Sequence, residues 1–215
     1  MTGDYIESPL HHMHNIFFDL DGTLHKEDIF LAFILFLAKK RILNTLIFLP
    51  LLLQAGTLHL FFANGKLGIN LALFCLTFGM NPARQQQLIA EFSQHFQLTP
   101  FANVREKLQQ HLANRQRIFL ISGSPAELIK PFYSALLAND NVQLISSQFT
   151  HRAYAMWLRD RCYAENKAIM LDRRFTPRIT FEIGYSDSLS DKAILDRCQQ
   201  AILIDKKGEM REFQR

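Results

Sequence analysis

The chain has 215 residues, of which 48% are hydrophobic and 20% charged, so the composition excludes a disordered or fibrous protein. The length suffices for one hydrophobic core and a small accessory domain. Cys75, Cys162 and Cys198 are widely spaced, which argues against a disulfide scaffold or zinc ribbon and favours reduced thiols in a cytosolic environment. The net charge is +4, but the basic residues do not form the dense clusters of a nucleic-acid groove, so we expect no nucleic-acid partner.

Residues 1–14 are polar and include His11, His12 and His14. We expect them to form a mobile leader before the first strand, rather than a metal site. Asp4 and Glu7 precede any apolar run, so no signal peptide is expected.

Short apolar runs that end in polar residues predict five buried strands. These strands cover residues 15–20, 117–122, 142–145, 179–184 and 201–204. Helical patterns lie between them, with Thr99, Ser124 and Ser190 as expected N-caps. Strands alternating with helices predict an α/β fold with a parallel sheet covered on both faces. Ligands bind such sheets beyond the carboxyl ends of the strands.

A strongly apolar helical segment interrupts this alternation over residues 28–97. No acidic residue occurs in 29–90. The basic residues of that stretch are Lys39, Lys40, Arg41, Lys66 and Arg84. The first apolar run is too short to span a bilayer, and Pro50 interrupts the second. We expect an inserted helical cap that dips into one leaflet of a membrane, with a compact cap that buries its own core as the alternative.

The segment FFDLDGTL at residues 17–24 carries the strongest chemical signal. Asp19 and Asp21 are two residues apart at the end of a predicted strand, and Gly22 permits a tight bend after it. One such carboxylate can attack a phosphorus atom while its neighbour handles the proton on the leaving oxygen.

The sequence resembles the haloacid-dehalogenase-like phosphatase superfamily, whose four motifs occur here in order. The resemblance implies a Rossmann-like core over residues 15–27 and 98–211, with Asp19 as the nucleophile and Asp21 as the general acid and base. It assigns the substrate phosphate to Thr23, Ser122, Gly123 and Lys167. Lys167 lies in the pattern CYAENK, where Ala164 replaces the glycine that relatives usually carry.

The segment GYSDSLSD at residues 184–191 matches the fourth motif. By the resemblance, Asp187 is a Mg²⁺ ligand together with Asp19 and the backbone carbonyl of Asp21, and Asp191 supports the site. A hard cation is needed because a carboxylate nucleophile is otherwise repelled by a dianionic phosphate.

A closer similarity, to the bacterial phosphatidylglycerophosphatase C family, extends over residues 16–209. It rests on the motifs above, the segment LPLL within the apolar insertion, LTFG at residues 76–79 and KGE at residues 207–209. It implies Mg²⁺-dependent dephosphorylation of phosphatidylglycerophosphate to phosphatidylglycerol, through an aspartyl-phosphate, in phospholipid biosynthesis. The expected location is the bacterial inner membrane with the active site facing the cytoplasm, and the expected partners are an anionic phospholipid and the membrane. The oligomeric state is left open.

Two other functions stay open. One is a soluble small-molecule phosphatase of the phosphoserine-phosphatase type. The other is a lipid-binding module without catalysis, against which the joint presence of Asp19, Asp21 and Lys167 speaks, because binding alone needs no nucleophile beside its acid.

Overall fold

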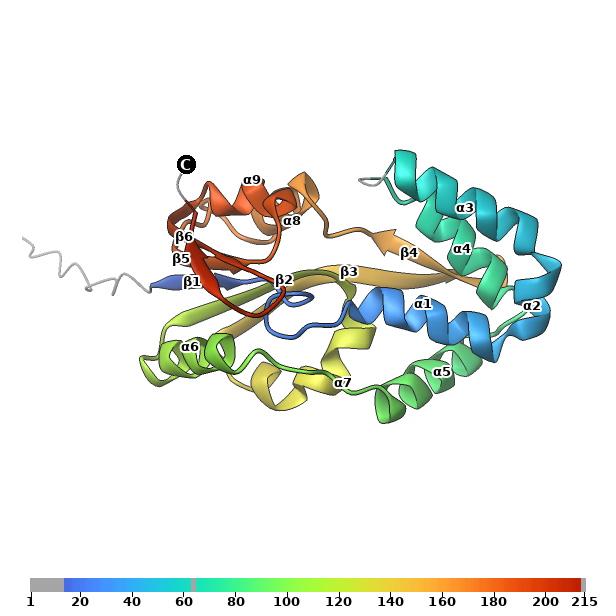
Figure 1. The fold of residues 1–215 in the computed structure, drawn as a ribbon, viewed down its shortest axis with the longest axis horizontal. Helices are drawn as coiled ribbons and strands as arrows, with labels where there is room; N and C mark the ends of the chain where they lie inside the picture. Colours follow the sequence, from blue (N-terminus) through green and yellow to red (C-terminus); the bar gives the residue numbers. More distant parts are fainter. Residues whose placement is uncertain (1–13, 63–64, 214–215) are drawn as a thin grey trace, which may run out of the picture.

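A seven-stranded sheet forms the centre of the protein, in the order β4-β3-β2-β1-β5-β6-β7 (Figure 1). The computed structural model describes residues 14–62 and 65–213, so His11 and His12 of the expected leader lie outside the described residues. The strands are β1 (Asn15–Phe18), β2 (Arg117–Pro125), β3 (Val142–Arg152), β4 (Ala155–Asp160), β5 (Phe181–Ser186), β6 (Cys198–Ile204) and β7 (Met210–Glu212). The five inner strands pair in parallel and the two edge strands antiparallel, which confirms the predicted α/β class.

Helices cover both faces of this sheet. On one face lie α6 (Ala102–Ala113) and α7 (Ala126–Leu137), and on the other α8 (Glu165–Arg174), the short η1 (Leu189–Asp191) and α9 (Lys192–Leu195). The alternation of side chains along β1 explains the two layers. Phe18 is buried against α6, whereas the neighbouring Phe17 is buried on the face that α8 and α9 cover.

The apolar insertion folds into five further helices at one end of the molecule (Figure 1). These are α1 (Ile29–Lys40), α2 (Ile42–Ile47), α3 (Leu49–Phe61), α4 (Leu67–Thr77) and α5 (Pro82–His95). Ile29, Phe33 and Leu37 of α1 recur every four residues and form the centre of a separate hydrophobic core. The β3–β4 hairpin extends from the sheet into this core, where it contributes Met156. These five helices are called the cap below. That they form a domain with limits at residues 28–97 stays a prediction.

The three predicted N-caps serve other purposes. Thr99 lies outside α6 and donates its backbone N–H to Glu27 over 2.8 Å. The Ser124 hydroxyl accepts a hydrogen bond from the N–H of Phe30 in the cap. Ser190 lies inside η1, and the side chain that caps this turn is that of Ser188. Polar residues before a helix can thus be used for tertiary contacts between the core and the cap instead.

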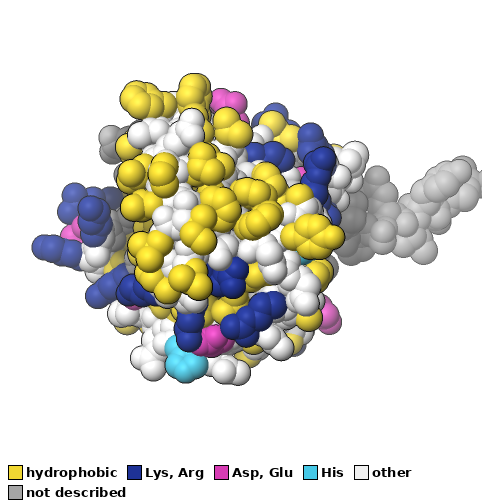
Figure 2. Space-filling view, turned by 90° about the vertical axis from the view of Figure 1, so that its right-hand side faces the viewer, with side chains coloured by type: hydrophobic (Ala, Val, Ile, Leu, Met, Phe, Trp, Pro, Cys, Tyr) yellow, Lys and Arg dark blue, Asp and Glu magenta, His cyan; other side chains and the backbone are white. Residues whose placement is uncertain are grey.

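The outer end of the cap exposes apolar side chains (Figure 2). Helix α2 buries none of its residues, and α3 buries only Ala55. The most exposed side chains include Leu60 at 81% and Phe61 at 82%. Among the described residues, however, no helix has both the length and the apolar character that crossing a membrane requires. The expected position of the chain in the bacterial inner membrane is therefore wrong.

Candidate active site

The predicted site residues meet at the carboxyl ends of β1, β2 and β5. Asp19 directly follows β1 and donates its N–H to the Tyr185 carbonyl of β5 over 2.9 Å. The chain then turns at Gly22, which has a positive φ of 76°. A side chain at Gly22 would meet Asp187 at 2.4 Å, so glycine allows the loop that carries Asp187 to lie directly against this turn.

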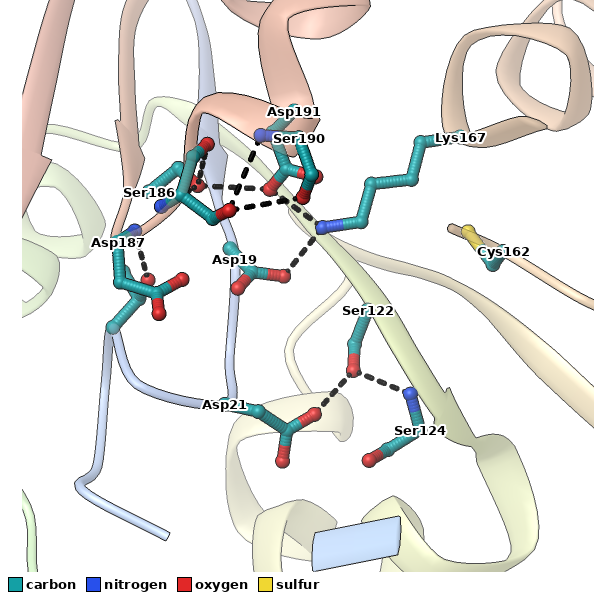
Figure 3. A network of polar contacts seen from close by, with 12 residues as sticks. Asp19, Asp21, Ser122, Ser124, Cys162, Lys167, Ser186, Asp187, Ser190 and Asp191 are labelled. Carbon is teal, nitrogen blue, oxygen red and sulfur yellow. Dashed lines mark hydrogen bonds and ion pairs between the residues drawn. The ribbon is translucent and has the colours of Figure 1, made fainter. Parts of the chain in front are cut away.

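Lys167 connects two carboxylates, those of Asp19 and Asp191 (Figure 3). Its Nζ atom lies 2.7 Å from Oδ1 of Asp19 and 2.6 Å from Oδ2 of Asp191. All three side chains are buried, and Ser186 donates a further hydrogen bond to Asp191. The lysine predicted from motif order alone therefore lies beside the predicted nucleophile.

The charges of this trio shift the pKa values of Asp19 and Lys167. Burial raises the pKa of Asp19 well above its usual range, Lys167 opposes that shift, and the carboxylates of Asp191 and Asp21 add to it. Burial lowers the pKa of Lys167, but the two carboxylates raise it by more, so the lysine is an ammonium at neutral pH. A further positive charge beside Asp19 would favour its ionised form, in which it can act as a nucleophile.

Asp21 is held by the loop and the neighbouring strand end. Its Oδ1 accepts a hydrogen bond from the N–H of Ile29, and its Oδ2 accepts one from the Ser122 hydroxyl over 2.9 Å. Ser122 also accepts the N–H of Ser124, which orients the hydroxyl. Asp21 is thus positioned at the start of α1, where the core joins the cap.

Thr23 connects two loops of the site. Its hydroxyl accepts the backbone N–H of Asp187 over 2.9 Å and so joins the first motif to the fourth. Gly123 lines the pocket above the site, next to Ser124. The roles of Thr23, Ser122 and Gly123 in binding phosphate stay predictions, since the described contacts of the two hydroxyls are with protein atoms.

Two features of the site were not predicted from the sequence, namely the contact of Ser186 with Asp191 and the backbone conformation of Ala164. Ser186, which supports Asp191, is the last residue of β5, and the motif GYSDS contains it without marking it. Ala164 has a φ of 50°, a conformation that glycine adopts without steric cost. The alanine that departs from the family pattern therefore keeps the backbone that a glycine would have there, just before α8 and Lys167.

The donor atoms suit a hard divalent cation. Carboxylates outnumber cations here, because Asp19, Asp21, Asp187 and Asp191 lie around the single ammonium of Lys167. Within the described residues, no group of three or more His, Cys, Asp or Glu side chains is arranged to hold a metal ion. The expected set of Asp19, Asp187 and the Asp21 carbonyl has two carboxylates and a carbonyl, and Mg²⁺ commonly completes such a set with water and substrate phosphate.

A pocket of about 670 Å³ opens above these groups. Its floor contains Asp19, Asp21, Lys167 and Asp187. Its walls are largely apolar, with Phe30, Leu31 and Ile34 from α1, Leu52 from α3, and Ile69 and Leu76 from α4. The core therefore supplies the polar floor and the cap supplies an apolar wall.

Solved structures of other proteins share this fold. The structure matches that of a Bordetella pertussis protein of unknown function with a TM-score of 0.65 and 18% identity, covering 89% of this chain and 90% of the other. A phosphoserine phosphohydrolase-like protein from Francisella tularensis matches with a TM-score of 0.57 and 17% identity, covering 89% and 87%. A structure described as a phospho-aspartyl intermediate analogue of phosphoserine phosphatase matches with a TM-score of 0.56 and 14% identity, covering 88% and 85%.

At these identities the likeness establishes the fold. The family model of the haloacid dehalogenase-like hydrolases matches residues 16–196, which include every predicted site residue. The match supports a hydrolase. This chain belongs to the haloacid dehalogenase-like hydrolase family.

Proposed function

We propose that this chain is a phosphatase that hydrolyses phosphomonoesters through a phosphorylated Asp19. The observation that carries the proposal is the pocket floor, where Asp19 lies 2.7 Å from the Lys167 ammonium and two residues before Asp21. The Asp19 carboxylate attacks phosphorus as the bond to the leaving oxygen breaks, and Asp21 gives that oxygen a proton. Asp21 then takes a proton from the water that attacks the phosphoaspartate, which releases phosphate, restores the Asp19 carboxylate and returns Asp21 to its protonated form.

Mg²⁺ is the proposed cofactor. Asp19, Asp187 and the backbone carbonyl of Asp21 would hold it, with Asp191 supporting the site through Lys167. When bound, the ion supplies positive charge beside the phosphate, which lets two anions approach each other. The ammonium of Lys167 neutralises part of the negative charge beside Asp19. Its burial strengthens this effect, because water does not screen the charge of a buried ammonium.

Two substrate classes fit different observations. The names of the similar structures favour a small phosphomonoester such as phosphoserine, and this alternative is backed better by the comparisons. The apolar wall of the pocket favours a phosphomonoester with a large apolar part. Phosphatidylglycerophosphate is the candidate of the second class, since the sequence resembles the enzymes that convert it to phosphatidylglycerol.

The exposed end of the cap supports an amphiphilic substrate independently of the pocket. An apolar helix is normally buried on most sides, yet Leu43 and Ile47 of α2 are each 71% exposed. An anionic phospholipid would cover such a surface with its acyl chains. The basic residues of the cap contribute less to binding an anionic phospholipid than their number suggests. Lys40 pairs with Glu91, and Arg41 donates to the Phe78 carbonyl.

The test is a comparison of three substrates with the full chain in detergent micelles and Mg²⁺. Phosphate release is measured from phosphatidylglycerophosphate, O-phosphoserine and p-nitrophenyl phosphate. A higher kcat/KM for the lipid supports the amphiphilic substrate, whereas a higher value for O-phosphoserine assigns the chain to the small-molecule class. Release from none of the three, with binding of anionic phospholipid vesicles retained, supports the lipid-binding module and refutes the phosphatase.

A further inference from the structure

Arg161 lies in the wall of the pocket that contains Asp19. It follows β4, and its guanidinium carbon lies 4.6 Å from the centre of the Tyr163 ring, which is within the range of a cation–π contact. Its Nη1 atom donates to the Gly65 carbonyl just before α4. The Tyr163 ring and the Gly65 carbonyl together orient the guanidinium.

No carboxylate compensates the charge of Arg161. Within residues 14–62 and 65–213, no carboxylate oxygen lies within 4.0 Å of its guanidinium nitrogens. Arg159, two residues earlier on β4, is exposed and pairs with Asp160 over 2.8 Å. Arg197 likewise pairs with Asp172 over 2.6 Å. Arg161 is therefore a half-buried cation whose charge faces a pocket instead of an acidic side chain.

The charge of Arg161 also acts on another residue that lines the pocket. Partial burial lowers the pKa of His59 on α3, and the charge of Arg161 lowers it further. His59 and Arg161 both line the pocket. This part of the pocket is thus more positive than the floor, where the carboxylates lie, so an anion is favoured beside Arg161 and a divalent cation beside Asp19.

We propose that Arg161 binds a second anionic group of the substrate, a carboxylate or a phosphodiester, while the phosphomonoester lies over Asp19. The inference rests on the proposed phosphatase activity and names a feature of its substrate. A guanidinium offers five N–H donors in a planar fork that matches both kinds of oxyanion. One donor is used by Gly65, which leaves others for the ligand. A pocket of about 670 Å³ has room for both groups of one substrate.

The test measures kcat and KM for wild type, Arg161→Gln and the matched control Arg159→Gln. The substrates are p-nitrophenyl phosphate, which has no second anion, O-phosphoserine, which has a carboxylate, and phosphatidylglycerophosphate, which has a phosphodiester. We expect Arg161→Gln to lower kcat/KM roughly 10- to 100-fold for a substrate with a second anion, as for other charged hydrogen bonds. The rate with p-nitrophenyl phosphate should stay within about twofold, as should all rates of Arg159→Gln.

The pattern of loss identifies the anion. A loss confined to O-phosphoserine assigns a carboxylate, and one confined to the lipid assigns a phosphodiester. Arg161→Lys, which keeps the charge but not the fork, should recover part of the loss. An equal loss with p-nitrophenyl phosphate, or no selective loss with either substrate that has a second anion, overturns the inference. A wild-type chain that hydrolyses none of the three overturns the proposed function itself.

Discussion

Replacing Lys167 by Met tests the buried charge network at the floor of the pocket. Methionine keeps most of the length and volume of lysine but removes its ammonium. The side chains of Asp19 and Asp191 are 8% and 2% exposed and then have no cation beside them, although Asp191 keeps its hydrogen bond from Ser186. Because water cannot reach these carboxylates readily, their charges are poorly compensated in the folded state.

The expected magnitude follows from this burial. Removing one partner of a buried ion pair costs about 3–5 kcal/mol, since the remaining charge has lost its compensation. We therefore expect the free energy of unfolding of Lys167→Met to fall by about that amount in buffer with a chelator. Phosphate release should also fall, by about 100-fold or more, as when a single charge-stabilising donor is removed.

Lys192→Met is the matched control. Its ammonium lies 2.7 Å from Asp196, which is the same as the distance between Lys167 and Asp19, but the lysine is 61% exposed. Water compensates such charges, so the control should lose at most about 0.5 kcal/mol. Both variants are measured by urea unfolding, with circular dichroism and the fluorescence of Trp157 as probes. A loss below about 1 kcal/mol for Lys167→Met, equal to that of the control, refutes the buried network.

Further predictions concern the proton, the metal and the core. Asp21→Asn should slow turnover by about 100- to 10,000-fold but leave phosphoenzyme formation from p-nitrophenyl phosphate detectable by trapping, because that leaving group needs no proton; full turnover would contradict the role of Asp21. A chelator should abolish phosphate release and added Mg²⁺ should restore it, and release that persists in the chelator contradicts the proposed cofactor. In Gly184→Ala the new methyl group would meet Cys198 at 2.4 Å, which should cost about 1–3 kcal/mol in urea unfolding. Gly56→Ala in α3 meets nothing within 4 Å and should gain about 0.5–1 kcal/mol, so equal effects of the two would contradict the described packing.

The sheet could be predicted where apolar runs end in polar residues. The five predicted strands correspond to β1, β2, β3, β5 and β6, which are the parallel strands of the core. Strand β4 was missed because the turn before it lacks glycine. Ala153 and Tyr154 take positive φ values of 50° and 56° there, which the sequence gives no reason to expect. The edge strand β7 has only three residues, too few for a pattern.

The site could be predicted where motifs specify adjacent residues. Asp19 and Asp21 lie in one segment of the chain, so their relation follows from strand geometry. Lys167 lies far from them in sequence, and only the fold brings its ammonium to Asp19. Nothing in the sequence distinguishes Arg161 from Arg152 or Arg159. The direction of each side chain along and after β4 depends on strand pairing and on Tyr163, which motif analysis does not provide.

The expectation of a membrane location failed for a physical reason. Composition records how apolar the residues of the insertion are, but not how the chain divides them among helices. The structure breaks the longest charge-free stretch at Phe48, so that α2 has six residues and α3 has 13. Pro50 lies in the first turn of α3, where proline is tolerated, and thus marks a helix start instead of a kink.

The most direct test of the central claim is to find which residue carries the phosphoryl group during turnover. The full chain is mixed with p-nitrophenyl phosphate and Mg²⁺, quenched in acid, digested and analysed by mass spectrometry, with Asp19→Asn treated in parallel. We predict a phosphorylated peptide that contains Asp19 in the wild type, and neither this peptide nor phosphate release in the variant. A phosphoryl group on another residue, or phosphate release by Asp19→Asn at the wild-type rate, would contradict the account.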